Sequence, residues 1–143
     1  MPMYWNEKTL LLKAETTYGT DPTPTGAANA ILATDVRLSP MEGQDVDQML
    51  DLPFMGASGT VATGLHAKIS FKVEVKGSGA AGTPPAFGPI LRACGCAEVI
   101  VATTSVTYSR VSKNHGSATI YMNIGGILYK LLGARGTCTM RVT

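Results

Sequence analysis

The chain is poor in several kinds of residue, and each shortage narrows what the protein can do. Only 15% of its 143 residues are charged, well below the usual quarter for a globular protein. The formal net charge is +2, so the chain lacks the strongly basic character with which many proteins grip nucleic acid. Sparse surface charge leaves area for protein neighbours. We therefore favour an assembling protein, with a monomer that has a Ser/Thr/Gly-rich surface as the open alternative.

Cysteine and histidine are scarce, which limits metal and redox chemistry. Three cysteines are an odd number, which argues against a complete disulfide framework. A single residue separates Cys94 from Cys96, whereas paired cysteines of structural zinc sites are usually two to four residues apart. We expect reduced, partly buried thiols; a zinc site of Cys94, Cys96, Cys138 and a histidine is the less favoured alternative. His66 and His115 are expected to be solvated.

Long apolar runs and catalytic motifs are also missing. No run approaches the ~20 residues that a membrane-spanning helix needs, and the first residues lack the basic and apolar segments of a signal peptide. We therefore expect a soluble protein that is made without export and has no membrane partner. Residues 77–79, Gly-Ser-Gly, lack the Gly-Lys-Ser/Thr ending of a phosphate-binding loop. We expect no catalytic residue, no cofactor and no bound metal.

Strand and turn patterns run along most of the chain. Residues 65–76 alternate apolar and polar side chains, which predicts a strand with one face on a core. Gly125-Gly126 lies between apolar runs at 117–124 and 127–132, which predicts a tight hairpin with two positive φ angles. Further strands are predicted at residues 9–14, within 29–40, and at 98–102, 105–111 and 137–143.

One stretch alone has a helical pattern. Residues 83–95 read TPPAFGPILRACG, with apolar side chains at i, i+3, i+4 and i+7. These four candidate packing residues are Phe87, Ile90, Leu91 and Cys94. Proline suits a helix start, and Gly95 suits a left-handed stop. We predict a short helix of about two or three turns that begins near Pro85 or Phe87 and packs on a sheet.

These elements predict a mainly β protein: a β-sandwich or distorted barrel of about eight strands with one short α-helix packed on it. The length suits a single domain, residues 1–143. Residues 1–8 form an amino-terminal arm, whose Tyr4 and Trp5 either tuck against the core or dock on a neighbour. Residues 16–26, rich in Thr, Pro and Gly, predict an extended loop, and residues 53–64 a second loop.

Three stretches share the order and spacing of a known family. The first is residues 77–79 with 83–95, and the second is residues 12–21, LKAETTYGTD. The third is residues 120–126, IYMNIGG, followed by Gly-Ala-Arg-Gly at 133–136. Taken together, nearly end to end, the chain resembles the tail tube (major tail) proteins of long-tailed bacteriophages. None of these motifs is catalytic.

The resemblance implies a non-enzymatic structural protein of the virion tail, made and assembled in the host cytoplasm. Tail tube proteins form hexameric rings that stack into a hollow tube, and strands from each subunit join into a β-barrel around the lumen. The implied partners are other copies of the chain, other phage tail proteins, and phage DNA that passes through without specific binding. One alternative is another ring-forming tail component, such as a terminator that caps a tube. An alternative of a different class is a monomeric β-barrel binding module.

The acidic stretch at residues 41–52 carries four carboxylates, which are Glu42, Asp45, Asp47 and Asp51. On its own it predicts a solvated hairpin, in which Asp45 and Asp47 share one strand face. The resemblance suggests that the four lie near the lumen or the ring-to-ring face, because a wall that binds phosphate would hold the DNA. The loops at residues 16–26 and 53–64 are candidates for reaching the next ring, or are plain surface loops.

Overall fold

The computed structural model describes residues 4, 6–51, 53–56 and 58–141. Along this part of the chain there are eight strands and two short helices, which confirms a mainly β fold with a short helix. The strands form one four-stranded sheet and two two-stranded sheets, and no barrel closes among the described residues. The chain divides into two compact units, Met1–Ala33 with Val73–Thr143 and, separately, Thr34–Lys72. Each unit is described by itself.

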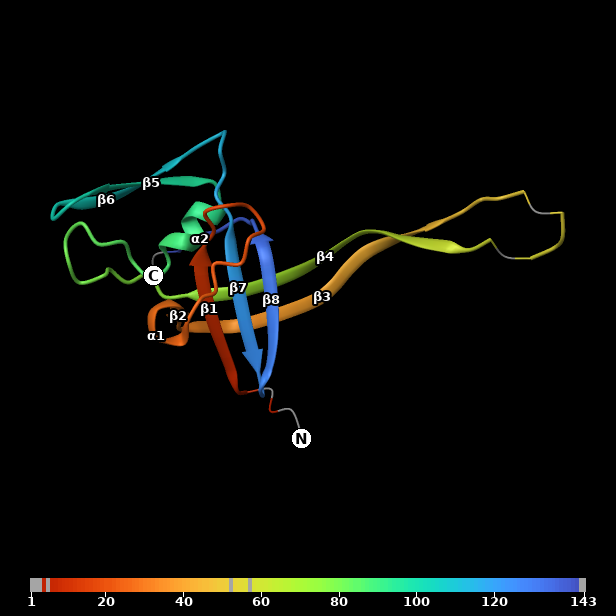
Figure 1. Ribbon diagram of the computed structural model, residues 1–143, viewed down its shortest axis with the longest axis horizontal. Helices are drawn as coiled ribbons and strands as arrows, with labels where there is room; N and C mark the ends of the chain where they lie inside the picture. The colour runs from red at the N-terminus through yellow and green to blue at the C-terminus, as the bar shows by residue number, and fades with distance from the viewer. Residues whose placement is uncertain (1–3, 5, 52, 57, 142–143) are drawn as a thin grey trace. The chain divides into compact units, whose positions relative to one another are not determined.

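The first unit is built on an antiparallel sheet with the strand order β2-β1-β7-β8 (Figure 1). The strands are β1 Lys8–Ala14, β2 Ala30–Ile31, β7 Ala118–Ile124 and β8 Ile127–Ala134. Every residue of β7 except Asn123 is buried. A strand that is covered on both faces has no reason to alternate, which explains why β7 reads ATIYMNI.

The core lies on both faces of β7 and on one face of β1. On one face, the register places Leu10 opposite Met122 and Leu12 opposite Ile120, and all four side chains are buried. On the other face of β7, Thr119 and Tyr121 are buried. The single turn α1, Gly26–Asn29, which the sequence did not predict, follows the loop at residues 16–25.

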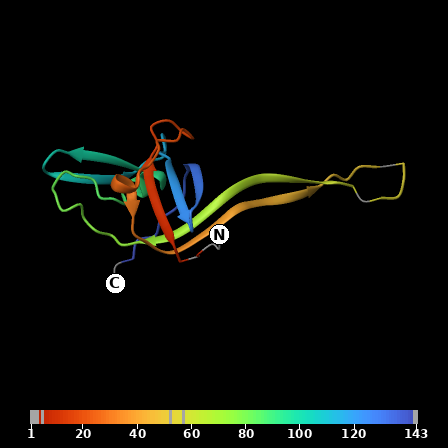
Figure 2. The same ribbon diagram turned by 60° about the horizontal axis from the view of Figure 1, so that its bottom comes forward.

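Helix α2, Gly88–Ala93, packs on β1, β5 and β7. Both ribbon views show it between β1 and the hairpin of β5, Cys96–Val101, with β6, Ser105–Arg110 (Figures 1 and 2). Of the predicted packing residues, Leu91 is buried and the other three, Phe87, Ile90 and Cys94, are half-buried. The helix is shorter than predicted because it starts at Gly88, with a proline in its first turn where no backbone donor is needed.

Two turn predictions are confirmed and one strand prediction is wrong. Gly125 and Gly126 have φ angles of 52° and 90°, and Gly95 has a φ of 85°. Residues 137–141, by contrast, form no strand, and residues 142–143 lie outside the described part. Residues 137–141 pair with no strand among the described residues; just before them, the Gly136 N–H donates to the Ala93 carbonyl of α2 at 3.2 Å.

The second unit is a β-hairpin of β3, Ala33–Asp47, with β4, Thr60–Val73. At about 3.3 Å per residue, strands of 15 and 14 residues are each roughly 45–50 Å long. Strand β4 begins inside the predicted loop at residues 53–64 and ends before residue 76, so these two predicted boundaries are wrong. The pair is the long ribbon from orange to yellow-green in Figure 1.

Candidate functional site

The β3–β4 hairpin is held together by cross-strand contacts along its length. Near the open end, Lys72 Nζ lies 3.0 Å from Asp35 Oδ2. Further along, Thr63 Oγ1 donates to the Gln44 carbonyl at 3.0 Å. A Cβ on Gly43 would lie 2.8 Å from the Leu65 side chain, so glycine permits close packing between the strands here.

The apolar face of β4 is not covered as the sequence predicted. We expected a core against the odd-numbered residues from Leu65 to Val75, yet Leu65 is 57% exposed and no residue of β4 is buried. Closer to the open end, Ile69, Phe71 and Val73 of the same face are half-buried while the even-numbered residues 66–72 are exposed, so the predicted alternation is present. Among the described residues β4 pairs with β3 alone, and its exposed large apolar side chains are Val61 and Leu65.

Other large apolar side chains in the second unit are exposed as well. With Leu65 they form a set, drawn from both faces of the strands and from the turn, that we call the hairpin apolar surface: Met41, Val46, Met49, Leu50, Phe54, Met55, Val61 and Leu65. Large apolar side chains gathered at an exposed surface are a mark of interaction sites and of aggregation hazards. A two-stranded hairpin is, in addition, marginally stable by itself in water. Both considerations favour a hairpin that is completed by contacts with neighbours.

The predicted acidic residues all lie in the half of the hairpin nearest its turn. Asp45 and Asp47 are exposed on β3, Asp51 is exposed beyond it, and Glu42 is half-buried. Within the described residues, Glu42 is the one of the four that lies near a basic side chain: its Oε2 is 3.8 Å from His66 Nε2, which makes an ion pair when the imidazole is protonated. The structure therefore places three of the four on one strand, without grouping them into a metal-binding cluster.

Charge divides the hairpin into two halves. Residues 42–65 contain four carboxylates and no Lys or Arg, whereas the remaining ends of the two strands carry three Lys or Arg residues and one Asp. These residues of the open half are Asp35, Arg37, Lys68 and Lys72. The turn half is therefore acidic and the open half is basic, which suits contacts between unlike halves of neighbouring copies.

A second polar site, which sequence reasoning missed, lies in the first unit around Glu15. Its buried carboxylate accepts four hydrogen bonds. The donors are Ser117 Oγ at 2.5 Å, Thr119 Oγ1 at 2.6 Å, Gly133 N–H at 2.7 Å and Gly19 N–H at 2.8 Å. Burial opposes ionisation, but these hydrogen bonds outweigh it and hold the pKa of Glu15 at about 2, below its usual 4.5.

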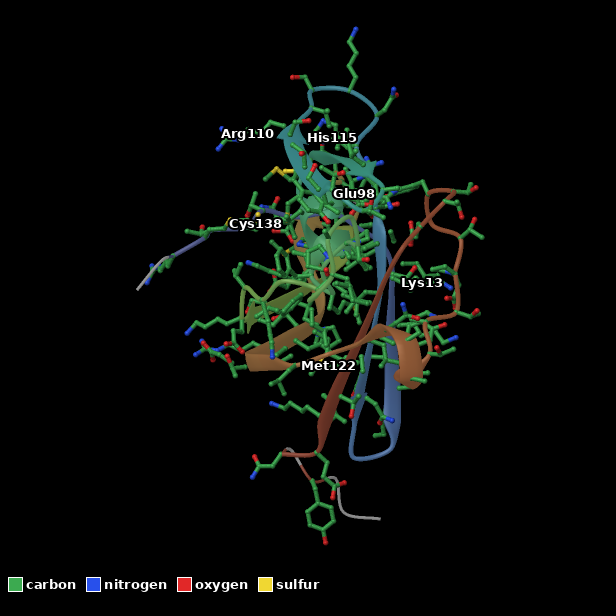
Figure 3. The ribbon with its side chains drawn as sticks, turned by 90° about the vertical axis from the view of Figure 1, so that its left-hand side faces the viewer. Lys13, Glu98, Arg110, His115, Met122 and Cys138 are labelled. Atoms are coloured by element: carbon green, nitrogen blue, oxygen red, sulfur yellow. The ribbon has the colours of Figure 1, made fainter. Side chains whose placement is uncertain are left out.

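The loop after Glu15 is fastened to the same sheet. Asp21 accepts hydrogen bonds from the Tyr121 hydroxyl and from Lys130 Nζ, and the tyrosine bond is the largest influence that lowers the pKa of Asp21. Lys13 Nζ donates to the Pro22 carbonyl at 2.9 Å (Figure 3). Arg135 lies 4.6 Å from the centre of the Tyr18 ring. The loop at residues 16–25 is therefore tied to its own chain, and its reaching a neighbouring ring stays a prediction.

No local pattern in the sequence reveals the Glu15 site. Ser117 and Thr119 lie 102 and 104 residues from Glu15 along the chain. The structure brings the three stretches of the family resemblance together here: residues 12–21 meet Gly133 through Glu15, and residues 120–126 pair with β1. The helix stretch contacts both β1 and β7.

The remaining candidates show little sign of a chemical site. Among the described residues, no group of His, Cys, Asp and Glu could hold a metal ion. A shallow depression of about 400 Å³ beside the Gly125-Gly126 turn is lined by polar residues and glycine, whereas ligand pockets are mostly apolar. His66 is exposed, and so is His115. Neither helix in the described part of the chain is long and apolar enough to cross a membrane.

Comparisons of the chain with family models, with curated proteins and with solved structures find no match. The function is therefore inferred from the chain's own residues and geometry.

Proposed function

We propose that the protein is a structural subunit of a phage tail tube, which self-assembles into stacked hexameric rings around a channel for DNA ejection. The observation that carries the proposal is the β3–β4 hairpin, whose strands pair only with each other among the described residues and whose described large apolar side chains between Met41 and Leu65 are exposed. The exposed apolar side chains of the hairpin support a structural, non-enzymatic role.

An unpaired strand edge promotes aggregation of a monomer, but in an assembly it can form the contact between subunits. An unpaired edge offers a row of N–H and C=O groups to any other strand. If hairpins of neighbouring subunits pair edge to edge around a ring, every edge is used and one wall of strands forms. A head-to-tail contact whose rotation divides the circle closes into such a ring. Stacked rings then cover the apolar residues near the hairpin turn.

The charges of the hairpin fit this arrangement. Asp45 and Asp47 are exposed and negatively charged. A channel wall lined by them would not bind the DNA phosphates, so the DNA could slide past it. Where one ring meets the next, the acidic turn half of a hairpin can lie against a basic open half that includes Lys68 and Lys72. Ring stacking then depends on ionic strength.

The test uses the purified full chain at increasing concentration, followed by sedimentation and negative-stain electron microscopy. The wild type is expected to give rings or hollow tubes with a central pore. The double variant Val46→Lys/Leu65→Lys places charge on the hairpin apolar surface and is expected to remain monomeric. The matched control, Val99→Lys, changes a β5 side chain that is 54% exposed, close to the 51% of Val46, and is expected to assemble.

Two other results would assign a different function. Rings that never stack, in the wild type at any concentration, would identify a cap such as a tail terminator. A wild type that stays monomeric even when an assembled tail-tip preparation is added as an initiator would overturn the proposal and favour a monomeric binding module. Equal assembly of the double variant and the wild type would show that the hairpin is not the interface.

A further inference from the structure

Three thiols gather where the carboxy-terminal segment meets α2. Cys94 follows the last residue of α2, Cys96 opens β5, and Cys138 comes from the carboxy-terminal segment, labelled in Figure 3. The Gly136 N–H donates to the Ala93 carbonyl at 3.2 Å, so the segment is bonded to the residue just before Cys94. A backbone contact between the two segments thus brings cysteines from distant parts of the sequence together.

Of the other two thiols, Cys138 has the larger influence on the pKa of Cys94. Burial, then the charge and the hydrogen bond of the Cys138 side chain, raise the pKa of Cys94 to about 11, whereas Cys96 acts on it through its charge alone. All three cysteines are free; Cys138 is exposed and the other two are half-buried. The exposed thiol of Cys138 is accessible to an oxidant, and a neighbouring thiol can resolve the mixed disulfide that forms there.

We propose that Cys94 and Cys138 form a reversible disulfide that fastens the carboxy-terminal segment to the end of α2. The oxidant is a small-molecule disulfide. The Cys138 thiolate attacks one of its sulfurs, which forms a mixed disulfide and releases one small thiolate. Cys94 then loses its proton to solvent and attacks the Cys138 sulfur, which releases the second small thiolate. In sum, two protein thiols are oxidised and one small disulfide is reduced to two thiols.

The bond would act mainly on the unfolded chain. It closes a loop from Cys94 to Cys138 that contains β5, β6, β7 and β8, and long closed loops remove the most freedom from the unfolded state. In reducing surroundings the bond stays open, and in oxidising surroundings it closes. The segment after Arg135, which forms no strand in its described residues, would gain a covalent anchor. The inference concerns the first unit and is independent of the assembly proposal.

The test treats the full chain with oxidised glutathione and then blocks free thiols with an alkylating reagent. Intact mass, peptide mapping and the melting temperature are measured before and after addition of a reductant. Before alkylation, the expected product is a monomer lighter by two hydrogen atoms, with Cys94 linked to Cys138. After alkylation the reduced chain carries three alkyl groups, whereas this product carries one, on Cys96. Its melting temperature is expected to rise by roughly 5–10 °C and to return on reduction.

Single substitutions separate the proposed pair from the third thiol. Cys96→Ser is the matched control and is expected to keep both the mass change and the thermal shift. Cys138→Ser, at an exposed position, and Cys94→Ser are expected to lose both. The proposal is overturned by a Cys96–Cys138 bond, by a lasting glutathione adduct on Cys138 in the wild type, by linked dimers, or by a thermal shift that persists in Cys138→Ser.

Discussion

The two units of the chain differ in what covers their strands. In the first unit, β7 lies between β1 and β8, and its residues are buried on both faces. Among the described residues of the second unit, β3 pairs with β4 alone, and β4 has half-buried residues but no buried one. Similar strand-forming sequences thus give a buried core in one place and a largely exposed hairpin in the other. Strand pattern alone tells where an apolar face is, and the topology decides whether the same chain covers it.

Polar groups show the same contrast. The Glu15 carboxylate is buried and accepts four hydrogen bonds, and no buried side-chain polar atom in the described residues lacks a partner. The ion pairs of the hairpin, such as Asp35 with Lys72, are exposed, and exposed pairs contribute little to stability. The described polar contacts of the first unit thus include a buried network, whereas the ion pairs of the second unit are exposed to solvent.

The largest expected effect comes from removing the hairpin. Residues 36–71 are deleted and a short Gly/Ser linker joins Asp35 to Lys72, whose side chains form an ion pair at 3.0 Å. Since the core belongs to the first unit, we expect a cooperatively folded monomer with complete loss of assembly. Circular dichroism melting and sedimentation measure both properties. A deleted chain that fails to fold would contradict the separation of the two units.

Next in size is the effect of Glu15→Gln in the first unit. Glutamine has one acceptor oxygen and turns an NH2 group toward donors that the carboxylate now satisfies. A pKa lowered from 4.5 to about 2 corresponds to roughly 3 kcal/mol of stability at neutral pH, which the variant should lose. Urea unfolding at pH 7 measures the loss. Glu7→Gln, at an exposed position, is the control and should change stability by less than about 0.5 kcal/mol.

The pH dependence of that loss has a definite sign. A carboxyl with a lowered folded pKa stabilises the fold above its unfolded pKa, and this stabilisation fades as pH falls toward the folded value. The wild type should therefore lose the contribution of Glu15 between about pH 5 and pH 2, and its unfolding free energy should approach that of Glu15→Gln. A constant difference between the two proteins across this range would show that Glu15 does not act through its charge.

Turns and local strands could be predicted because their signals are short-range. Gly125-Gly126 between two apolar runs specifies a hairpin wherever it occurs, and both residues have the expected positive φ. Strands β5 and β6 flank Thr103, whose φ of 58° marks the turn that separates two apolar runs. In each case a few neighbouring residues contain the whole signal.

Long-range pairings could not be predicted in this way. The residues around Glu15 in the sequence do not predict that its carboxylate is buried and hydrogen-bonded, since its partners Ser117 and Thr119 are more than a hundred residues away. The alternation at residues 137–143 resembled a strand, but a strand also needs a partner with free N–H and C=O groups. Likewise, the four acidic residues were recognised as a stretch, while the division of the hairpin into acidic and basic halves depended on knowing which segments pair.

A smaller effect is expected where α2 meets the β5–β6 hairpin. An added Cβ at Gly88 would lie 2.5 Å from the Tyr108 hydroxyl and 3.2 Å from Glu98 Oε2, which are hydrogen-bonded to each other at 2.6 Å. Gly88→Ala should therefore cost about 1–3 kcal/mol by overpacking. Gly26→Ala has open space around the added Cβ and is the control. Equal unfolding free energies for the two variants would show that this contact can relax freely.

The smallest effect on folding, and the sharpest contrast between folding and assembly, is expected from reversing charge on the hairpin. Asp45→Lys/Asp47→Lys alters two exposed side chains, so the unfolding free energy should change by less than about 0.5 kcal/mol. Assembly and DNA delivery should nonetheless change, because the acidic half would then repel a basic half and attract phosphate. Sedimentation at low and high salt measures assembly, and DNA release from assembled tails measures delivery.

The matched control is Glu74→Lys, which changes an exposed residue just outside β4. If the double variant assembles and delivers DNA like the control at every salt concentration, the acidic half faces neither the lumen nor another ring, and the hairpin would assemble through its apolar surface and edges alone.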